Sequence, residues 1–210
     1  MNQNNGKNSL GLDRCFEDLA NPVDLFKKWF SKAEESEIND PNAVAIATAD
    51  KNNQPNARMV LLKGLSNKGF VFYTNFNSKK GQDLKNNPNA SMCFHWKSLR
   101  RQVRISGNVS VVDVNEADKY FNSRDYGSRI AAWASTQSKV MNNRNDFLKK
   151  VKDFEKKFSD KNNVPRPPHW SGWRVNPDQV EFWLEVKNRT HERLNYVLKK
   201  GVWIKEILYP

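Results

Sequence analysis

Two apolar strand-like runs with polar flanks occupy residues 58–80. The first, RMVLLK, is aliphatic, and the second, FVFYTN, is rich in the aromatic and β-branched residues that favour strands. GLSNKG between them supplies turn residues, so the stretch predicts a β-hairpin. Ser78 is then a candidate N-cap, and the free N–H groups of the following helical turn, with Lys79 and Lys80, would suit an anion. Taken alone, the stretch is more typical of a solvated rim of lysines than of an anion site.

The positions of Arg58 and Lys63 restrict how this stretch can bind a ligand. They differ by an odd number of residues and would point to opposite faces of a regular strand. Both reach one ligand only if the strand bends, if a bulge intervenes, or if they serve neighbouring ligands.

The remainder of the chain continues as short strands and amphipathic helices. Asn21-Pro22 begins a helix, with a cap followed by proline at the first helical position. Helices are also expected from Asn115, from Ser128 and over 147–158, and strands over 43–49, 91–96, 101–112, 180–186, 192–199 and 202–208. Short turns between neighbouring strands predict an antiparallel barrel or sandwich, mainly β with flanking helices. We expect a flexible tail over residues 1–20 and a single domain over 21–210.

Composition limits the classes of function. The 210 residues include 35 Lys and Arg against 23 Asp and Glu, a net charge of +12 that favours an anionic partner. Two isolated cysteines and three scattered histidines give no disulfide framework or metal motif. We therefore expect no metal. Without an apolar leader or spanning segment, the expected location is the cytoplasm, away from membranes.

A second cationic group lies near the C-terminus, where Arg189, His191 and Arg193 alternate along the chain. If a strand extends through them, the three side chains share one face. Such crowding of positive charge suits a bound phosphate or carboxylate. The alternative is an exposed edge strand whose charges prevent aggregation.

Several motifs together resemble one known family. RMVLLK, FYTN followed by SKK, RQV, KYFNSR with AAWASTQS, and EFW with RTHER stand in the order and near the spacing of the pyridoxine/pyridoxamine 5′-phosphate oxidase family. The resemblance covers the chain from about Asn21 to the C-terminus. It implies an antiparallel, FMN-binding split β-barrel that works as a homodimer, with FMN at the subunit interface.

The resemblance also implies site residues. For FMN these are Arg58, Met59, Val60, Leu61, Leu62, Lys63, Tyr73, Thr74, Ser78, Lys79, Lys80, Gln102, Gln137, Ser138, Trp183 and Arg193. For the substrate they are Lys63, Tyr120, Arg124, Ser128, Arg189, Thr190 and His191. Arg189 and His191 are the expected catalytic residues. The implied reaction oxidises pyridoxine 5′-phosphate or pyridoxamine 5′-phosphate to pyridoxal 5′-phosphate, with O2 reduced to H2O2, in vitamin B6 salvage.

Two other functions remain open from the sequence. The first is a flavin-binding split-barrel reductase or binding protein with another substrate. The second is a basic nucleic-acid-binding barrel, which the net charge would favour. The lysine-rich helix over 147–158 lacks aromatic residues on its polar side, so we expect no nucleic-acid partner.

Overall fold

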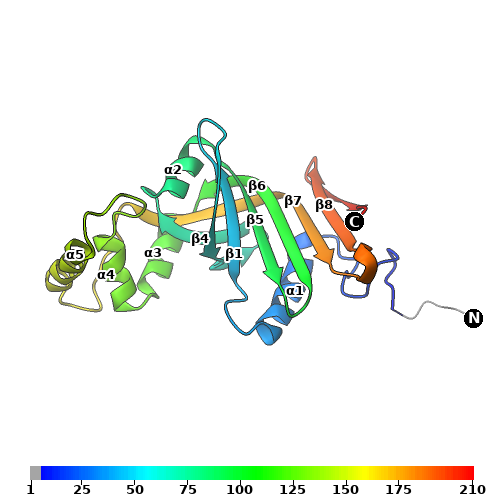
Figure 1. The fold of residues 1–210 in the computed structure, drawn as a ribbon, viewed down its shortest axis with the longest axis horizontal. Helices are drawn as coiled ribbons and strands as arrows, with labels where there is room; N and C mark the ends of the chain where they lie inside the picture. The colour runs from blue at the N-terminus through cyan, green and yellow to red at the C-terminus, as the bar shows by residue number, and fades with distance from the viewer. Residues whose placement is uncertain (1–5) are drawn as a thin grey trace, which may run out of the picture.

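Antiparallel strands form one curled sheet in the computed structural model, which describes residues 6–210 (Figure 1). Seven strands run in the order β2-β1-β5-β6-β7-β4-β3, and β8 and β9 continue from β7, so the described residues contribute nine strands. The strands are β1 (Ala43–Ala49), β2 (Pro55–Leu61), β3 (Gly64–Ser66), β4 (Gly69–Asn75), β5 (Asn89–Trp96), β6 (Arg101–Val111), β7 (Trp170–Leu184), β8 (Glu192–Lys199) and β9 (Val202–Ile207). The predicted antiparallel, mainly β fold is confirmed.

Helices flank this sheet. They are α1 (Pro22–Ser36), α2 (Lys79–Asn86), α3 (Val114–Asn122), α4 (Tyr126–Ala134) and α5 (Arg144–Lys157), with a short 3-10 turn at Lys187–Arg189. Asn21 caps α1 by accepting the Val23 N–H at 2.9 Å, as predicted. Asp113 and Asp125 cap α3 and α4 in the same way, so these helices begin one or two residues earlier than expected.

The fifteen-residue strand β7 connects the two ends of the molecule. It pairs with β4 through residues 170–175 and with β8 through residues 179–184, while β6 runs beside it on the other edge. A bulge at Ser106/Gly107 bends the β6–β7 pair. A Cβ on Gly107 would lie 2.0 Å from the Asn176 carbonyl oxygen, so only glycine fits there.

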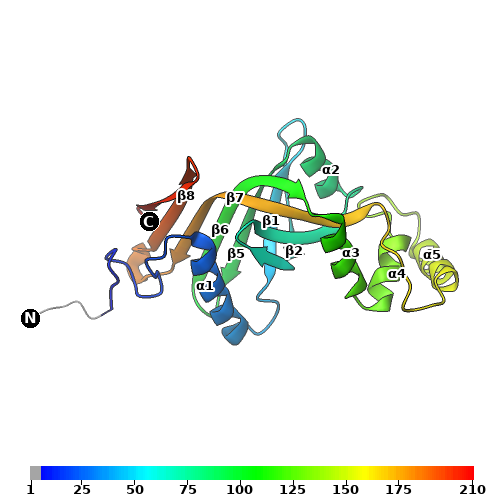
Figure 2. The same cartoon turned by 180° about the vertical axis from the view of Figure 1, so that it is seen from behind.

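The main core lies between the sheet and α1, which Figure 2 shows against the sheet. Phe26 of α1 packs edge-on against Phe70 of β4 and Phe94 of β5, with ring centroids 4.9 and 5.0 Å apart. Burying such a side chain contributes about 1.5–3 kcal/mol to folding. Helix α1 therefore fills the open side of the half-barrel.

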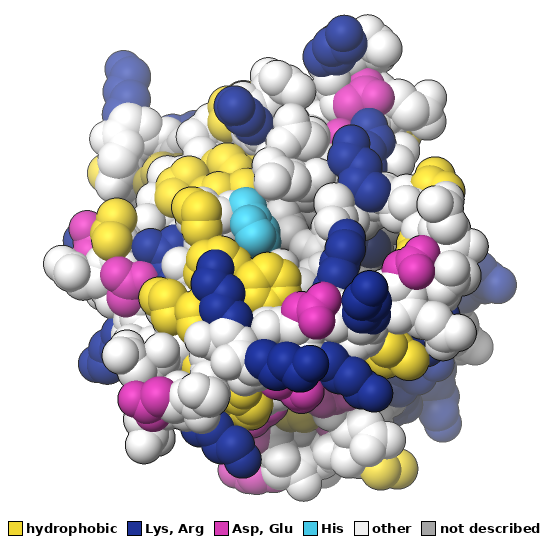
Figure 3. All heavy atoms as spheres, turned by 90° about the vertical axis from the view of Figure 1, so that its left-hand side faces the viewer, with side chains coloured by type: hydrophobic (Ala, Val, Ile, Leu, Met, Phe, Trp, Pro, Cys, Tyr) yellow, Lys and Arg dark blue, Asp and Glu magenta, His cyan; other side chains and the backbone are white. Residues whose placement is uncertain are grey.

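Helices α3, α4 and α5 gather at the other end of β7 around a smaller core. In this core Val151, Phe154 and Phe158 are only partly buried. Figure 3 shows this end of the molecule, where hydrophobic side chains gather beside a histidine and Lys and Arg side chains lie around them. The lysine-rich face of α5 is solvated, in agreement with the sequence.

Two local expectations were wrong. Residues 59–62 do not form a hairpin with residues 70–73, because β2 pairs with β1 and β4 pairs with β3 and β7. Strand β8 begins at Glu192 as expected, so Arg189 and His191 precede it and do not share a strand face with Arg193; Asn188 and Arg189 adopt φ of 57° and 60°. The segment expected as a tail packs on the core, where Phe16 is fully buried. Its first five residues lie outside the described part of the chain.

Candidate functional site

A cleft of about 380 Å³ opens between the ends of β2 and β4 and helices α3 and α4. Its lining combines backbone edges, hydroxyl groups, aromatic rings and cations. The lining residues are Met59, Val60, Leu61, Lys63, Tyr73, Thr74, Asn75, Lys80, Tyr120, Arg124, Ser128, Ala131, Ala132, Ser135, Gln137 and Trp170. Eleven of the residues predicted to bind cofactor or substrate thus meet in one cavity.

The charge of this cleft is entirely positive among the residues described. Lys63, Lys80 and Arg124 line it, and no Asp or Glu does. Burial lowers the pKa of Arg124, and burial followed by the nearby Arg58 charge lowers the pKa of Lys80. Burial disfavours the charged form of both side chains, and a bound anion would offset that cost. The cleft therefore suits a phosphate or carboxylate.

The Arg124 side chain contains an unsatisfied hydrogen-bond donor. Its Nη1 atom is buried and has no hydrogen-bond partner within the described chain. Helix α3 ends at Asn122, so Arg124 lies in the link before α4, yet it and Tyr120 both face the cleft. An unpaired buried N–H costs about 1–3 kcal/mol, which a bound anion would recover.

Aromatic rings form the floor beside Arg124. The Tyr73 and Tyr120 rings stack at 3.9 Å, and the Trp170 ring lies 5.3 Å from Tyr73. Burial raises the pKa of the Tyr73 hydroxyl to about 12. Gly172 allows the stack, because a Cβ there would lie 2.8 Å from a Tyr73 ring carbon.

A hydrogen-bond chain links α2, β4 and the segment after α4. Lys80 Nζ donates to Thr74 Oγ1 at 3.1 Å, and Thr74 Oγ1 donates to the Gln137 side-chain oxygen at 3.2 Å. This chain places three of the predicted cofactor residues on one wall. Ser138 follows with φ of 69° and lies outside the cleft lining.

Other predicted residues lie near the cleft without lining it. Ser78 is buried and accepts the Gly81 N–H at 3.3 Å, which confirms it as the cap of α2. Arg58 and Lys79 contact the buried Asp83. Leu62 is 5% exposed and belongs to the core, so the side chain cannot contact a ligand in the cleft.

The remaining predicted residues gather at the far end of β7. Gln102 pairs with Trp183 across β6 and β7, and Trp183 pairs with Arg193 across β7 and β8. The His191 ring lies 4.6 Å from the Trp183 ring. Arg189 and Thr190 are exposed in the turn just before.

The His191 ring is oriented by the backbone. Its Nδ1 atom accepts the Val186 N–H at 3.2 Å, so the proton of the neutral ring resides on Nε2. Arg193 donates to the buried Glu181 carboxylate at 2.9 Å and to the Tyr209 carbonyl at 2.8 Å. These side chains are therefore held at a defined surface rather than extended freely into solvent.

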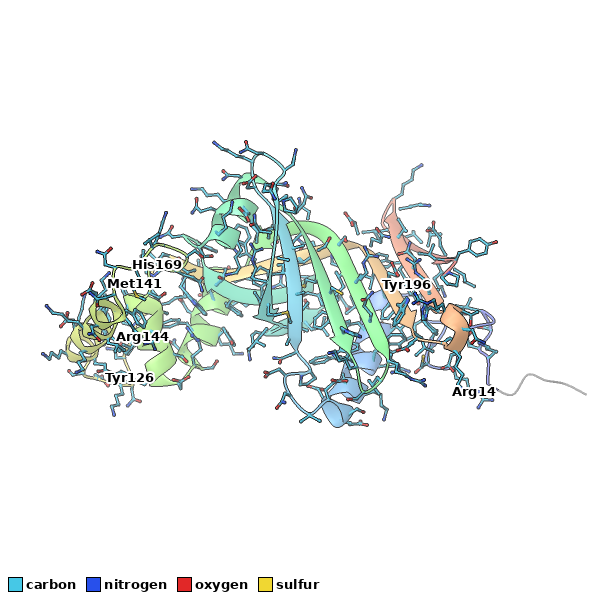
Figure 4. The ribbon with its side chains drawn as sticks, viewed as in Figure 1. Arg14, Tyr126, Met141, Arg144, His169 and Tyr196 are labelled. Carbon is cyan, nitrogen blue, oxygen red and sulfur yellow. The ribbon has the colours of Figure 1, made fainter. Side chains whose placement is uncertain are left out.

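The two groups cannot meet within one chain. Trp170 and Trp183 stand at opposite ends of β7, about 40 Å apart along the strand at ~3.3 Å per residue. Figure 4 marks the same separation, with Met141, Arg144 and His169 at the helical end and Arg14 and Tyr196 at the other. The predicted site residues of one chain thus form two separate groups, which we call the cleft half-site and the C-terminal half-site.

Sequence reasoning missed some cleft residues. Asn75, Ala131, Ala132, Ser135 and Trp170 line the cleft without having been assigned a role. The FYTN and AAWASTQS motifs contain four of them, so motif membership was the available signal. Trp170 carried no such signal.

Residues 6–210 contain no group of three or more His, Cys, Asp or Glu side chains that could hold a metal ion. Within the same range, no helix has the length and hydrophobicity needed to span a bilayer.

A curled antiparallel half-barrel with a cation-lined cleft at one end defines the class as a split-barrel protein. The sequence model described as pyridoxamine 5′-phosphate oxidase matches residues 30–184. A second, described as the pyridoxine 5′-phosphate oxidase C-terminal dimerisation region, matches residues 170–210. The chain belongs to the pyridoxamine 5′-phosphate oxidase family.

Relatives agree over nearly the whole chain. A pyridoxine/pyridoxamine 5′-phosphate oxidase of Pelagibacter ubique is 58% identical over 98% of this chain and 100% of its own length. One from Agrobacterium fabrum is 50% identical over 93% of this chain and 95% of its own. The chain is therefore similar to curated enzymes of this family.

Solved structures share the fold. PhzG from Burkholderia lata, in complex with tetrahydrophenazine-1-carboxylic acid, has a TM-score of 0.87 and 27% identity, covering 93% of this chain and 96% of that chain. A pyridoxamine 5′-phosphate oxidase-related, FMN-binding protein from Nostoc punctiforme has a TM-score of 0.69 and 17% identity, covering 88% and 97%. The second likeness concerns the fold alone.

Proposed function

We propose that the protein is an FMN-dependent oxidase that converts pyridoxine 5′-phosphate or pyridoxamine 5′-phosphate to pyridoxal 5′-phosphate and passes the electrons to O2, forming H2O2. The observation that carries this proposal is the buried, unpaired Nη1 atom of Arg124 in a cleft whose charged lining residues, within the described chain, are all cations. Relatives named as such oxidases, at 50–58% identity, support the choice of substrate.

The substrate phosphate fits the helical wall of the cleft. Tyr120, Arg124 and Ser128 supply two hydroxyl groups and a guanidinium there. Lys63 adds a second charge from the end of β2. Phosphate dianions are anchored by such charge-assisted hydrogen bonds.

The residues present also fit FMN. Met59, Val60 and Leu61 offer a strand edge, while Lys80 and Thr74 offer polar atoms on the facing wall. Bound FMN would accept the hydride that leaves the substrate carbon. The protein's task is to hold that carbon in line and to exclude water, which is catalysis by positioning.

We infer that a homodimer completes each site. Arg189 and His191 cannot reach Arg124 of their own chain, so they act on a ligand in the cleft only from a second copy. The similarity of residues 170–210 to a dimerisation region supports this arrangement, with FMN between the subunits. In it, the Nε2–H of His191 and the Arg189 guanidinium orient the substrate ring.

The deciding experiment is a visible spectrum of the purified protein supplied with FMN, followed by anaerobic addition of pyridoxine 5′-phosphate. We expect the bound flavin band to bleach and to return when air is admitted. A flavin that stays oxidised would refute the oxidase function.

A second candidate is an oxidase of this family that acts on a carboxylate. The PhzG structure contains a carboxylic acid, and a cation-lined cleft suits a carboxylate as well as a phosphate. Bleaching by a cyclic carboxylate but not by pyridoxine 5′-phosphate would favour it. Family membership argues against a nucleic-acid-binding barrel.

A further inference from the structure

A buried carboxylate stands behind the cationic rim of the proposed cofactor site. Asp83 lies in α2 and is 1% exposed, although it carries a charge. Its Oδ1 atom is 3.0 Å from Lys79 Nζ, and its Oδ2 atom is 3.7 Å from Arg58 Nη2. A buried carboxylate is costly unless it is paired, so these contacts explain how Asp83 is tolerated.

A hydroxyl group joins the same network. Thr48 Oγ1 donates to Asp83 Oδ2 at 2.7 Å and accepts from Arg58 Nη1 at 2.7 Å. Arg58 Nη1 also donates to the Asn56 carbonyl at 3.1 Å. The Arg58 guanidinium is thereby fixed between β1, β2 and α2.

The network adjoins the cleft through Lys80. Lys80 follows Lys79 at the start of α2 and lines the cleft, and the Arg58 charge is close enough to lower its pKa further after burial. Lys79 is also 3.2 Å from Asp50, so two carboxylates hold it. Arg58, Lys79 and Lys80 therefore form a fixed group of cations beside the cleft, of which Lys80 lines it.

We propose that Asp83 is a positioning residue that holds Arg58 and Lys79 in place for the phosphate group of FMN. This inference rests on the proposed function, because it assumes that FMN is the ligand. Two opposing effects make the role testable. As a charge alone, Asp83 repels a phosphate, so its removal would tighten binding. As a positioning group it preorganises the cations, so its removal would weaken binding.

The test compares FMN with riboflavin, which lacks the phosphate. Dissociation constants of both are measured by quenching of flavin fluorescence for the wild-type apoprotein and for Asp83→Asn. We expect Asp83→Asn to weaken FMN binding about tenfold, the scale of one charge-assisted contact, and to change riboflavin binding less than twofold. A merely structural role would weaken both ligands equally.

Two further variants complete the design. Thr48→Val keeps Asp83 and removes only the hydroxyl link, so we expect a smaller FMN-specific loss of about threefold. It decides the question if Asp83→Asn does not fold. Asp24→Asn makes the same charge change in an exposed pair with Lys27 on α1, and should change neither affinity.

The other possible results separate the positioning role of Asp83 from the proposed oxidase function. Unchanged or tighter FMN binding by Asp83→Asn and Thr48→Val, or equal loss of FMN and riboflavin, would overturn the positioning role. Wild-type protein that binds FMN but is not bleached by substrate would overturn the proposed oxidase and leave this inference standing. Absence of FMN binding by the wild type would overturn both.

Discussion

The guanidinium of Arg124 lies over the indole ring of Trp170, with its central carbon 4.8 Å from the ring centroid. This cation–π contact holds the side chain without neutralising it, since no carboxylate lines the cleft among the residues described. The charge therefore stays available to a ligand, while the aromatic face fixes its position. A planar guanidinium suits such a surface better than an ammonium does.

Replacing Arg124 by lysine should specifically weaken binding of the substrate phosphate. Lysine keeps the charge but loses the planar fork and the contact with Trp170. We expect KM for pyridoxine 5′-phosphate to rise about tenfold or more, with FMN affinity unchanged. Steady-state kinetics and a flavin titration measure the two effects. Arg144→Lys, at the exposed start of α5, is the matched control, and an unchanged KM for Arg124→Lys would contradict the assignment.

Two inactive variants with lesions in different half-sites should restore activity when mixed. Arg124→Ala damages the cleft half-site, and His191→Ala damages the C-terminal half-site. If each site combines two chains, a hybrid dimer has one intact site, so a mixture unfolded and refolded together should regain about a quarter of wild-type activity. Arg124→Ala mixed with Tyr120→Ala should regain nothing, because both lesions lie in the same half-site. Equal recovery in both mixtures would exclude the shared site.

Alanine at position 172 should disturb the aromatic stack. Its Cβ would lie 2.8 Å from a Tyr73 ring carbon and 2.9 Å from Val112, so the Tyr73 ring must shift. Overpacking of this kind costs about 1–3 kcal/mol in free energy of unfolding, measured by urea denaturation. Gly127→Ala is the control, because its nearest neighbour is 3.4 Å away and the helix should gain about 0.5–1 kcal/mol. Equal stability of both variants would show that the Tyr73 ring can shift without a measurable cost in free energy of unfolding.

The stability of the protein should fall at alkaline pH in a way that depends on Tyr73. Burial raises its pKa to about 12 in the folded state, against about 10 for an unfolded chain. The neutral form is thus favoured by folding, and this contribution is complete below pH 10 and is lost as pH rises through 12. Tyr73→Phe cannot ionise, so its free energy of unfolding should decline less between pH 9 and pH 11. An identical decline would show that Tyr73 ionises freely in the fold.

Local structure was the part that the sequence predicted well. The helix start at Asn21 depends on a side-chain oxygen and a proline, and the strand Ala43–Ala49 depends on its own apolar residues. Both signals are carried by neighbours in the chain. The same is true of the Ser78 cap.

Long-range pairing was the part that it could not predict. The turn between residues 62 and 70 suggested a hairpin, but β2 finds its partner in β1 and β4 finds one in β7, about a hundred residues away. Phe16 stands in a polar segment, and only the assembled core makes its burial favourable. Asn188 adopts a left-handed backbone conformation. The local sequence did not indicate this, because an extended conformation is also allowed for the residue.

Some residues of the candidate site could be predicted from local motifs, and others depend on the assembled fold. Motifs identified residues such as Tyr120 and Arg124, which a cleft then brought together. Trp170 was missed because its role arises from the ring stack and not from its neighbours in sequence. The split into two half-sites follows from the length of β7, which no motif describes.

The length of β7 has a consequence for how such a chain can diverge. Loops at either end can gain or lose residues, because each half-site would move as a unit with its own helices or strands. Inserting one residue within β7 would turn every following side chain to the opposite face and shift Trp183 by about 3.3 Å relative to Trp170. The length of β7 therefore fixes the distance between the two half-sites. Insertions and deletions in descendants of this sequence should concentrate outside this strand.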